Sequence, residues 1–346
     1  MSAGAPPDLR LDGLEPLPAT PSGRGRALGR DPFLDAAPRD PGPAWEPFRF
    51  PPPAPRARHG ARGRPREEAA EPGPAQGLVE RWLGDDVRRR LAALDARGGA
   101  DPFGLSPDAV RRALPLFLAL YRGWFRVESR GREHLPKRGG ALLVANHAGL
   151  LPFDGAMASL DVWLGTDPPR LPRALFDPFV ERLGPVRRVF EALGPVLACR
   201  ENLAALLAAG ELALVFPEGV EGIVKPVTQR YRLQTFRTGF VRAALAAGAP
   251  IVPVAIVGSE DQAPILWDVK PLARRLGLPA APITPTFPWL GPLGLLPYPV
   301  RYRIVYGEPL DLGARGGPEA ADDPQRVRAL AREVRRAVQR LLDRSR

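Results

Sequence analysis

The chain reads ALLVANHAGLLPFDGAMASLDVW from Ala141 to Trp163. Five small or apolar residues come first, a loop containing glycine and proline follows, and a segment with a helical pattern ends the stretch. Asn146 and His147 stand where the apolar run stops, and Asp154 stands where the helix is expected to begin. The stretch predicts a buried strand that leads through a polar loop into a helix.

The same alternation of short apolar runs and helical patterns continues on both sides. The expected strands are Phe125–Glu128, Ala141–Ala145, Ala174–Phe176, Ala213–Phe216, Ile251–Val257 and Tyr302–Tyr306. The expected helices are Gly155–Trp163, Phe179–Ala192, Glu201–Ala209 and Thr238–Ala247. Strands and helices in alternation predict an α/β fold, a single domain with a largely parallel central sheet flanked by helices.

Three segments differ in character. Residues 1–76 hold 17 of the 44 prolines and no apolar periodicity, which predicts a disordered Pro-rich tail. Residues 77–123 predict N-terminal helices, the second capped by Ser106 with Pro107 at its first position. They could anchor the protein at a membrane interface or pack on the core. Residues 124–346 are expected to form the α/β domain and to end in a basic helix after Asp323.

The charge lies in the folded part. The net charge is +11, and residues 1–76 contribute 11 Arg against 10 acidic residues. An excess of this size suits an anionic partner such as nucleic acid, anionic lipid or a phosphorylated substrate, or reflects a general preference for Arg. No base-stacking motif or zinc module supports nucleic acid. We therefore expect no nucleic-acid partner and favour an anionic membrane surface.

The location follows from what the sequence lacks. One cysteine, Cys199, excludes an intrachain disulfide and a Cys-based zinc site. The longest apolar run, 114–121, is far shorter than the ~20 residues of a spanning helix. We expect a cytoplasmic protein that is peripheral on the inner face of the membrane. It would attach through Leu114–Phe125, through its basic body and through Pro279–Pro299, an apolar stretch in which Pro and Gly predict no regular structure.

His147 is the strongest candidate for chemistry. It follows a strand, and strand carboxyl ends are where ligands bind in α/β sheets. The chain has no Gly-x-Ser-x-Gly elbow and no Walker phosphate loop, and Cys199 has no histidine near it in sequence. If the protein is an enzyme, the economical mechanism is a histidine base acting on the substrate's own hydroxyl, with Asp154 orienting the imidazole. A histidine that merely caps a loop is the alternative.

Four blocks of sequence extend this hypothesis. They are Asn146-His147 through Asp154, Gly194-Pro195-Val196-Leu197-Ala198-Cys199-Arg200, Phe216-Pro217-Glu218-Gly219 and Val252-Pro253-Val254-Ala255. In this order and spacing they resemble the glycerolipid acyltransferase family, the 1-acylglycerol-3-phosphate acyltransferases and their relatives, over about residues 124–310. The resemblance identifies residues 124–346 as the acyltransferase domain.

The resemblance implies an activity and a set of site residues. The protein would move a fatty acyl group from an acyl thioester, acyl-CoA or acyl-carrier protein, to a hydroxyl of a glycerolipid, such as the lysophospholipid lysophosphatidate. No metal or further cofactor is implied. His147 would be the general base and Asp154 its partner. The implied substrate-binding residues are Asn146, Arg200, Glu218 and Gly219, with Arg200 gripping a phosphate.

Two departures from the family pattern bear on the substrate. Six residues separate His147 from Asp154, where the family usually has four. The third block continues with Val220-Glu221-Gly222 in place of a hydroxyl and a basic residue. A neutral acceptor such as diacylglycerol and a catalytically degenerate lipid-binding protein therefore stay open. Four basic residues could replace the missing phosphate ligand: Lys225, Arg230, Arg232 and Arg237.

Overall fold

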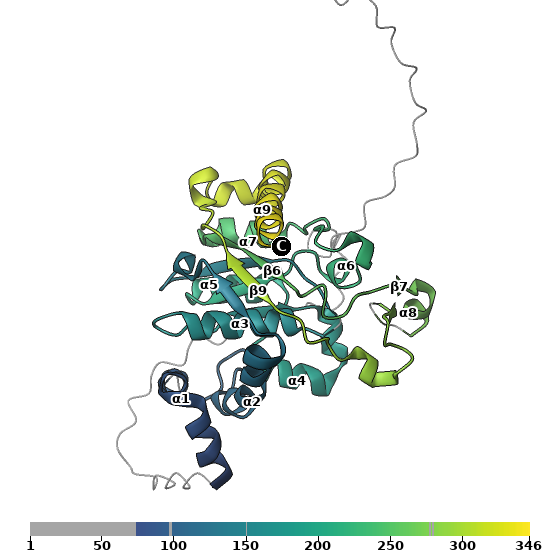
Figure 1. Cartoon of the computed structure of the whole chain (residues 1–346). Coiled ribbons are helices and arrows are strands. Elements are labelled where there is room, and N and C mark those ends of the chain that lie inside the picture. Colours follow the sequence, from purple (N-terminus) through teal and green to yellow (C-terminus); the bar gives the residue numbers. More distant parts are fainter. Residues whose placement is uncertain (1–73, 97–98, 150, 277, 279) are drawn as a thin grey trace, which may run out of the picture.

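A seven-stranded sheet forms the centre of the molecule (Figure 1). The computed structural model describes residues 74–96, 99–149, 151–276, 278 and 280–346. The strand order is β1-β9-β6-β2-β5-β3-β4. The strands are β1 (Glu128–Arg130), β2 (Ala141–Ala145), β3 (Arg173–Phe176), β4 (Val196–Leu197), β5 (Leu212–Val215), β6 (Ile251–Val257) and β9 (Arg303–Tyr306).

The sheet is largely parallel, as predicted. β6, β2, β5, β3 and β4 pair in parallel, whereas β9 runs antiparallel to β6 and parallel to β1. Every residue of β2 and β5 is buried, as expected for central parallel strands covered on both faces. Because five neighbouring strands share one direction, the loops that follow β2, β4, β5 and β6 all leave the same edge of the sheet.

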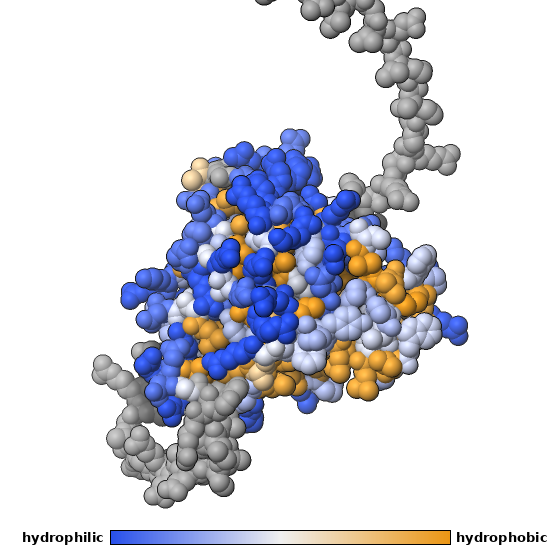
Figure 2. Space-filling view, in the orientation of Figure 1, coloured by the Kyte–Doolittle hydropathy of each residue, from blue (hydrophilic) through white to orange (hydrophobic). Residues whose placement is uncertain are grey.

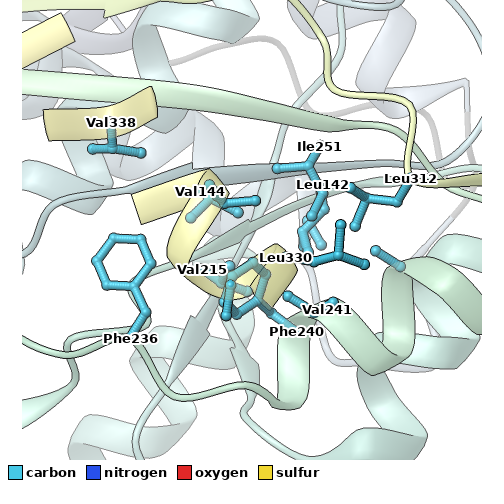
Figure 3. Close-up of a cluster of buried hydrophobic side chains, with 14 of the residues drawn as sticks. Leu142, Val144, Val215, Phe236, Phe240, Val241, Ile251, Leu312, Leu330 and Val338 are labelled. Atoms are coloured by element: carbon cyan, nitrogen blue, oxygen red, sulfur yellow. The ribbon is translucent and has the colours of Figure 1, made fainter. Parts of the chain in front are cut away.

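Helices cover both faces of this sheet. The helices of the described residues are α1 (Pro74–Asp95), α2 (Pro107–Ala119), α3 (Phe153–Gly165), α4 (Gly184–Leu193), α5 (Arg200–Ala208), α6 (Val220–Ile223), α7 (Gly239–Ala247), α8 (Lys270–Leu276) and α9 (Pro324–Ser345). One buried cluster joins β2 through Leu142 and Val144 to α5, α7 and α9. Figure 3 shows these strand residues facing Phe240 and Leu330. Leu143 and Ala145 join the second cluster, with α2 and α3.

The terminal helices pack against the core. Ser106 caps α2 as predicted, and Leu114 and Leu118 of that helix are buried. Asp323 caps α9 by accepting the N–H groups of Gln325 and Arg326. Most of the tail predicted over residues 1–76 lies outside the described residues, and α1 already begins at Pro74. Among the described helices, none combines the length and the apolar character needed to cross a membrane.

Three local predictions were wrong. A π-helical turn, Leu120–Trp124, extends α2, so β1 begins at Glu128 and not at Phe125. The helix expected over Phe179–Ala192 is a 3₁₀ turn, Pro178–Arg182, followed by α4, because Gly184 and Pro185 start a new helix. Within Pro279–Pro299, β8 (Pro282–Ile283) pairs with β7 (Trp267–Asp268), and Gly291–Leu295 forms a 3₁₀ turn.

Candidate active site

His147 and Asp154 form a hydrogen-bonded pair at the carboxyl edge of the sheet. His147 follows β2, and Asp154 lies in the first turn of α3. His147 Nδ1 is 2.6 Å from Asp154 Oδ2. The same oxygen accepts the N–H of Ala148 at 3.0 Å, and Oδ1 accepts the N–H of Gly155 at 2.7 Å. The carboxylate is fully buried, so the longer loop still holds it against the imidazole.

The pairing defines which imidazole nitrogen can act as a base. A carboxylate that accepts from Nδ1–H leaves the lone pair on Nε2. In the described part of the chain, Nε2 has no hydrogen-bond partner. The ring stacks on Phe216 with centroids 4.3 Å apart. Burial opposes the charged imidazole, but the charge and hydrogen bond of Asp154, with the charge of Glu218, outweigh it and raise the pKa of His147.

Glu218 holds the backbone of His147 from the neighbouring strand. Its Oε1 accepts the N–H of His147 at 3.1 Å, and its Oε2 accepts the N–H of Gln234 at 2.7 Å. The side chain is fully buried. Both oxygens are bonded within the protein, and the role of Glu218 as a substrate-binding residue stays a prediction.

Lys225 lies between two buried carboxylates, which corrects its place among the possible phosphate ligands. Its Nζ is 2.8 Å from Glu260 Oε1 and 3.5 Å from Glu218 Oε2, and it donates to the carbonyl of Arg232 at 3.1 Å. Burial raises the pKa of Glu260, and the Lys225 charge opposes this only in part. The ammonium therefore compensates buried charge and fixes the loop behind His147.

Asn146, which was predicted to bind substrate, is fully buried between two strands. Its Oδ1 accepts the N–H of Ile256 at 2.7 Å, and its Nδ2 donates to the carbonyl of the same residue at 3.1 Å. The side-chain amide thus extends the ladder between β2 and β6 by one step. Asn146 thereby fixes the start of the loop that carries His147.

Two glycines allow close approaches around this loop. Gly219 has φ +57°, and a Cβ there would lie 3.2 Å from Arg237 Cζ. A Cβ on Gly222 would lie 2.9 Å from the carbonyl oxygen of His147 and 2.8 Å from Glu218 Cβ. Gly222 therefore lets α6 pack directly on the backbone of His147. Its importance could not be read from the sequence, where it only marked the departure in the third block.

Arg237 and Arg200 are two basic side chains that follow strands at this edge of the sheet. Arg237 is partly exposed beside Gly219, and Arg200 is exposed at the start of α5, after β4. Neither guanidinium has a partner among the described residues. Three strand spacings separate β2 from β4, roughly 14 Å at ~4.8 Å each. Arg237 lies beside Gly219, which follows β5, and β5 is the strand next to β2. Of the two arginines, Arg237 is therefore the nearer to His147 along the sheet. Arg230 is paired with Asp261 at 2.7 Å, and Arg232 is exposed.

Gln262 is a further residue that sequence reasoning missed. It follows β6, and its Nε2 donates to the carbonyl of Ala148 at 3.2 Å. Its Oε1 accepts the hydroxyl of Tyr302 at 2.7 Å. The loop after His147 is thereby joined to the segment between β6 and β9. No local pattern in the sequence marks this glutamine.

Comparison with known proteins shows what the chain is similar to. A family model described as Acyltransferase matches residues 126–257, a range that contains all six predicted site residues. An uncharacterized protein of Mycobacterium leprae is 47% identical over 244 residues, which are 70% of this chain and 66% of that protein. An uncharacterized protein of Mycobacterium tuberculosis is 46% identical over 246 residues, 70% and 68% of the two chains. The match thus spans about two thirds of these relatives.

Two more distant similarities involve named proteins. A human protein named "DGAT1/2-independent enzyme synthesizing storage lipids" is 27% identical over 231 residues, 64% of this chain and 62% of that protein. The crystal structure of the 1-acyl-sn-glycerophosphate acyltransferase PlsC from Thermotoga maritima aligns with a TM-score of 0.41 and 21% identity, over 77% of this chain and 88% of that one. The family model matches the region that holds the four sequence blocks, and the chain belongs to the glycerolipid acyltransferase family that those blocks resemble.

Proposed function

We propose that the protein transfers a fatty acyl group from an acyl thioester to a hydroxyl of a glycerolipid, with His147 as general base. The observation that carries this proposal is the His147–Asp154 pair at 2.6 Å, with Nε2 unpartnered among the described residues at the carboxyl edge of the sheet. An intact pair of this kind favours a catalyst over a degenerate lipid-binding protein.

The reaction needs only this pair and the two substrates. Nε2 accepts the proton of the acceptor hydroxyl as its oxygen attacks the thioester carbonyl. The buried Asp154 carboxylate stabilises the imidazolium that forms. When the carbon–sulfur bond breaks, the imidazolium returns the proton to the departing thiolate. The products are an ester and a free thiol, and the base is restored. The donor is an acyl-CoA or an acyl-carrier protein, since both carry acyl thioesters.

A phosphate-bearing acceptor such as lysophosphatidate is favoured by the two guanidinium groups. The third block lacks its basic residue, but Arg237 approaches Gly219 from the segment before α7. A planar guanidinium can bind phosphate through two parallel N–H groups. Arg237 therefore stands where it can supply the charge that the block has lost, and Arg200 lies on the same edge.

A neutral acceptor such as diacylglycerol is the second candidate. It is supported by Val220-Glu221-Gly222, which stand in the third block in place of a hydroxyl and a basic residue. The name of the human relative, which refers to the synthesis of storage lipids, supports it as well. Binding of a neutral glycerolipid would leave Arg237 and Arg200 without a ligand on the acceptor.

The deciding experiment supplies purified protein with each donor and a panel of acceptors in mixed micelles. The panel contains lysophosphatidate, other lysophospholipids and diacylglycerol. We expect an acylated product that requires the thioester donor and is formed fastest with lysophosphatidate. Turnover of diacylglycerol alone would select the second candidate. A folded protein that releases no thiol and forms no ester with any pair of substrates would refute acyl transfer.

A further inference from the structure

The segment between β6 and β9, residues 258–301, leaves the sheet at the edge that carries His147. We call it the docking segment. Gln262 donates to the carbonyl of Ala148, in the loop between β2 and α3 that carries His147, which we call the catalytic loop. The N–H of Tyr298 in turn donates to the carbonyl of Gln262 at 2.7 Å. In Figure 1, β7 and α8 of this segment lie on the same side of the molecule as α6, which directly follows Gly219. The orientation of the docking segment is thus fixed relative to the active site.

This segment exposes large apolar side chains from several short elements. Trp289 is 75% exposed, Leu293 is 70% and Trp267 is 68%. The others are Leu266, Leu272, Leu278, Leu290 and Leu296. Figure 2 shows apolar side chains gathered on the face that carries β7, α8 and the turn that follows them. A soluble monomer rarely exposes so many large apolar groups together unless they contact a partner.

Exposed apolar side chains also lie outside the docking segment. The indole Nε1 of Trp124, in the turn after α2, donates to the carbonyl of Pro297 at 3.1 Å. Leu116 of α2 is 62% exposed, and α4 has no buried residue and exposes Val186 and Val189. The end of α2 is therefore joined to the docking segment.

Basic side chains accompany the apolar ones. Lys270, Arg274 and Arg275 of α8 are exposed, and none has an ion-pair partner among the described residues. From residue 266 to 299 the only acidic residue is Asp268, and its Oδ1 already accepts the N–H of Ala281 at 3.0 Å. Tryptophan beside unpaired cationic groups is typical of surfaces that enter the headgroup region of anionic bilayers.

We propose that the docking segment inserts Trp267, Trp289 and Leu293 into an anionic lipid bilayer and presents the His147 edge to the lipids within it. The exposed apolar groups are spread over a strand pair, a short helix and a 3₁₀ turn. That arrangement suits a bilayer better than the single groove or helix face of a protein–protein contact. This proposal rests on the proposed function, because docking at a bilayer gives the active site access to a glycerolipid acceptor that lies in that bilayer.

Vesicle sedimentation tests the proposal independently of catalysis. The wild-type protein should bind phosphatidylglycerol vesicles more tightly than phosphatidylcholine vesicles, and binding should weaken with salt. The double variant Trp289→Asp/Leu293→Asp should lose at least tenfold in affinity for both. Lys270→Gln/Arg274→Gln/Arg275→Gln should lose the preference for anionic lipid. The matched control removes three exposed charges from α9, Arg328→Gln/Arg332→Gln/Arg336→Gln, and should change binding less.

Separate outcomes distinguish this proposal from the proposed function. His147→Ala should bind vesicles like wild type, whether or not acyl transfer occurs. The Trp289→Asp/Leu293→Asp variant should still acylate a water-soluble short-chain acceptor while losing activity on vesicle-embedded lipid. If that variant fails to fold, bromine-labelled acyl chains should quench the fluorescence of the wild type more than that of Trp289→Phe. Equal quenching, unchanged vesicle affinity of the double variant, or a wild-type dimer that the substitutions dissociate without any vesicle binding would overturn the proposal.

Discussion

His147 Nδ1 lies 2.6 Å from Asp154 Oδ2 although the loop between the two residues is two residues longer than the family pattern. Two features make this possible. Asp154 lies in the first turn of α3, and its oxygens also accept the N–H groups of Ala148 and Gly155. The loop closes on the carboxylate at both ends. The extra residues therefore lie in the loop without separating the pair.

The pair predicts a pH dependence. Only neutral His147 can accept a proton, so kcat/KM should fall as the pH drops through the pKa of His147, which lies above its ordinary value of about 6.5. Asp154→Asn removes the charge that raises this pKa. The acidic limb should then move to lower pH, and kcat should fall roughly 10²–10⁴-fold, because the imidazole loses its orientation and its counter-charge. An acidic limb at the same pH in both proteins would contradict this role of Asp154.

The buried cluster behind the loop predicts a loss of stability. Lys225→Met leaves Glu218 and Glu260 buried without their shared cation. Breaking a buried ion pair from one side costs about 3–5 kcal/mol. The loss should be measured as a lower midpoint of urea unfolding at pH 7. Lys270→Met is the matched control, since this lysine is exposed, and its change should stay within about 0.5 kcal/mol. Equal midpoints for the two variants would refute a structural role of Lys225.

The close packing around Gly222 predicts that a single added methyl group lowers the rate of acyl transfer. In Gly222→Ala the new Cβ would lie 2.9 Å from the His147 carbonyl oxygen, and this backbone atom cannot rotate away. The catalytic loop should shift, and kcat should fall at least tenfold while the far-UV circular dichroism stays unchanged. Gly184→Ala, also in a helix but with no atom within 4 Å of the new Cβ, should keep wild-type turnover. Full activity of Gly222→Ala would show that the loop can shift without consequence.

The chemical class of the acceptor determines how substitutions of Arg237 and Arg200 should change its KM. With a phosphate-bearing acceptor, Arg237→Ala should raise the KM for that acceptor, because binding loses a charged hydrogen bond worth about 1.5–3 kcal/mol. Arg200→Lys should also raise it, because an ammonium cannot reproduce the paired N–H donors. Arg328→Ala on α9 serves as the control. Saturation curves with lysophosphatidate and with diacylglycerol measure the effect. An unchanged KM for lysophosphatidate in both variants would favour the neutral acceptor.

Local patterns in the sequence were enough to predict the largely parallel sheet and the contact between His147 and Asp154. The apolar run 141–145 predicts a central strand, and the polar residues that follow it necessarily lie at the sheet edge. The four blocks then identify the family. These predictions succeed because each depends on neighbours within a few residues.

The roles of the supporting residues depend on distant contacts and could not be predicted. The side-chain amide of Asn146 is hydrogen-bonded to Ile256, 110 residues away. Lys225, considered as a possible phosphate ligand, pairs with Glu260, 35 residues away. Gln262 joins the catalytic loop across 114 residues. A polar residue in a sequence pattern looks the same whether its partner is substrate, water or a distant strand.

The most direct test of the account is the rate of acyl transfer by His147→Ala, with His134→Ala as its control. His134 lies outside the site, where its Nδ1 contacts the carbonyl of Tyr306 at 2.9 Å. We expect His147→Ala to lose roughly 10²–10⁴-fold in kcat, as is usual when a general base is removed, while its far-UV circular dichroism shows that the fold is retained. His134→Ala should keep most of the activity. A folded His147→Ala protein with near wild-type turnover would contradict the assignment of His147 as the base.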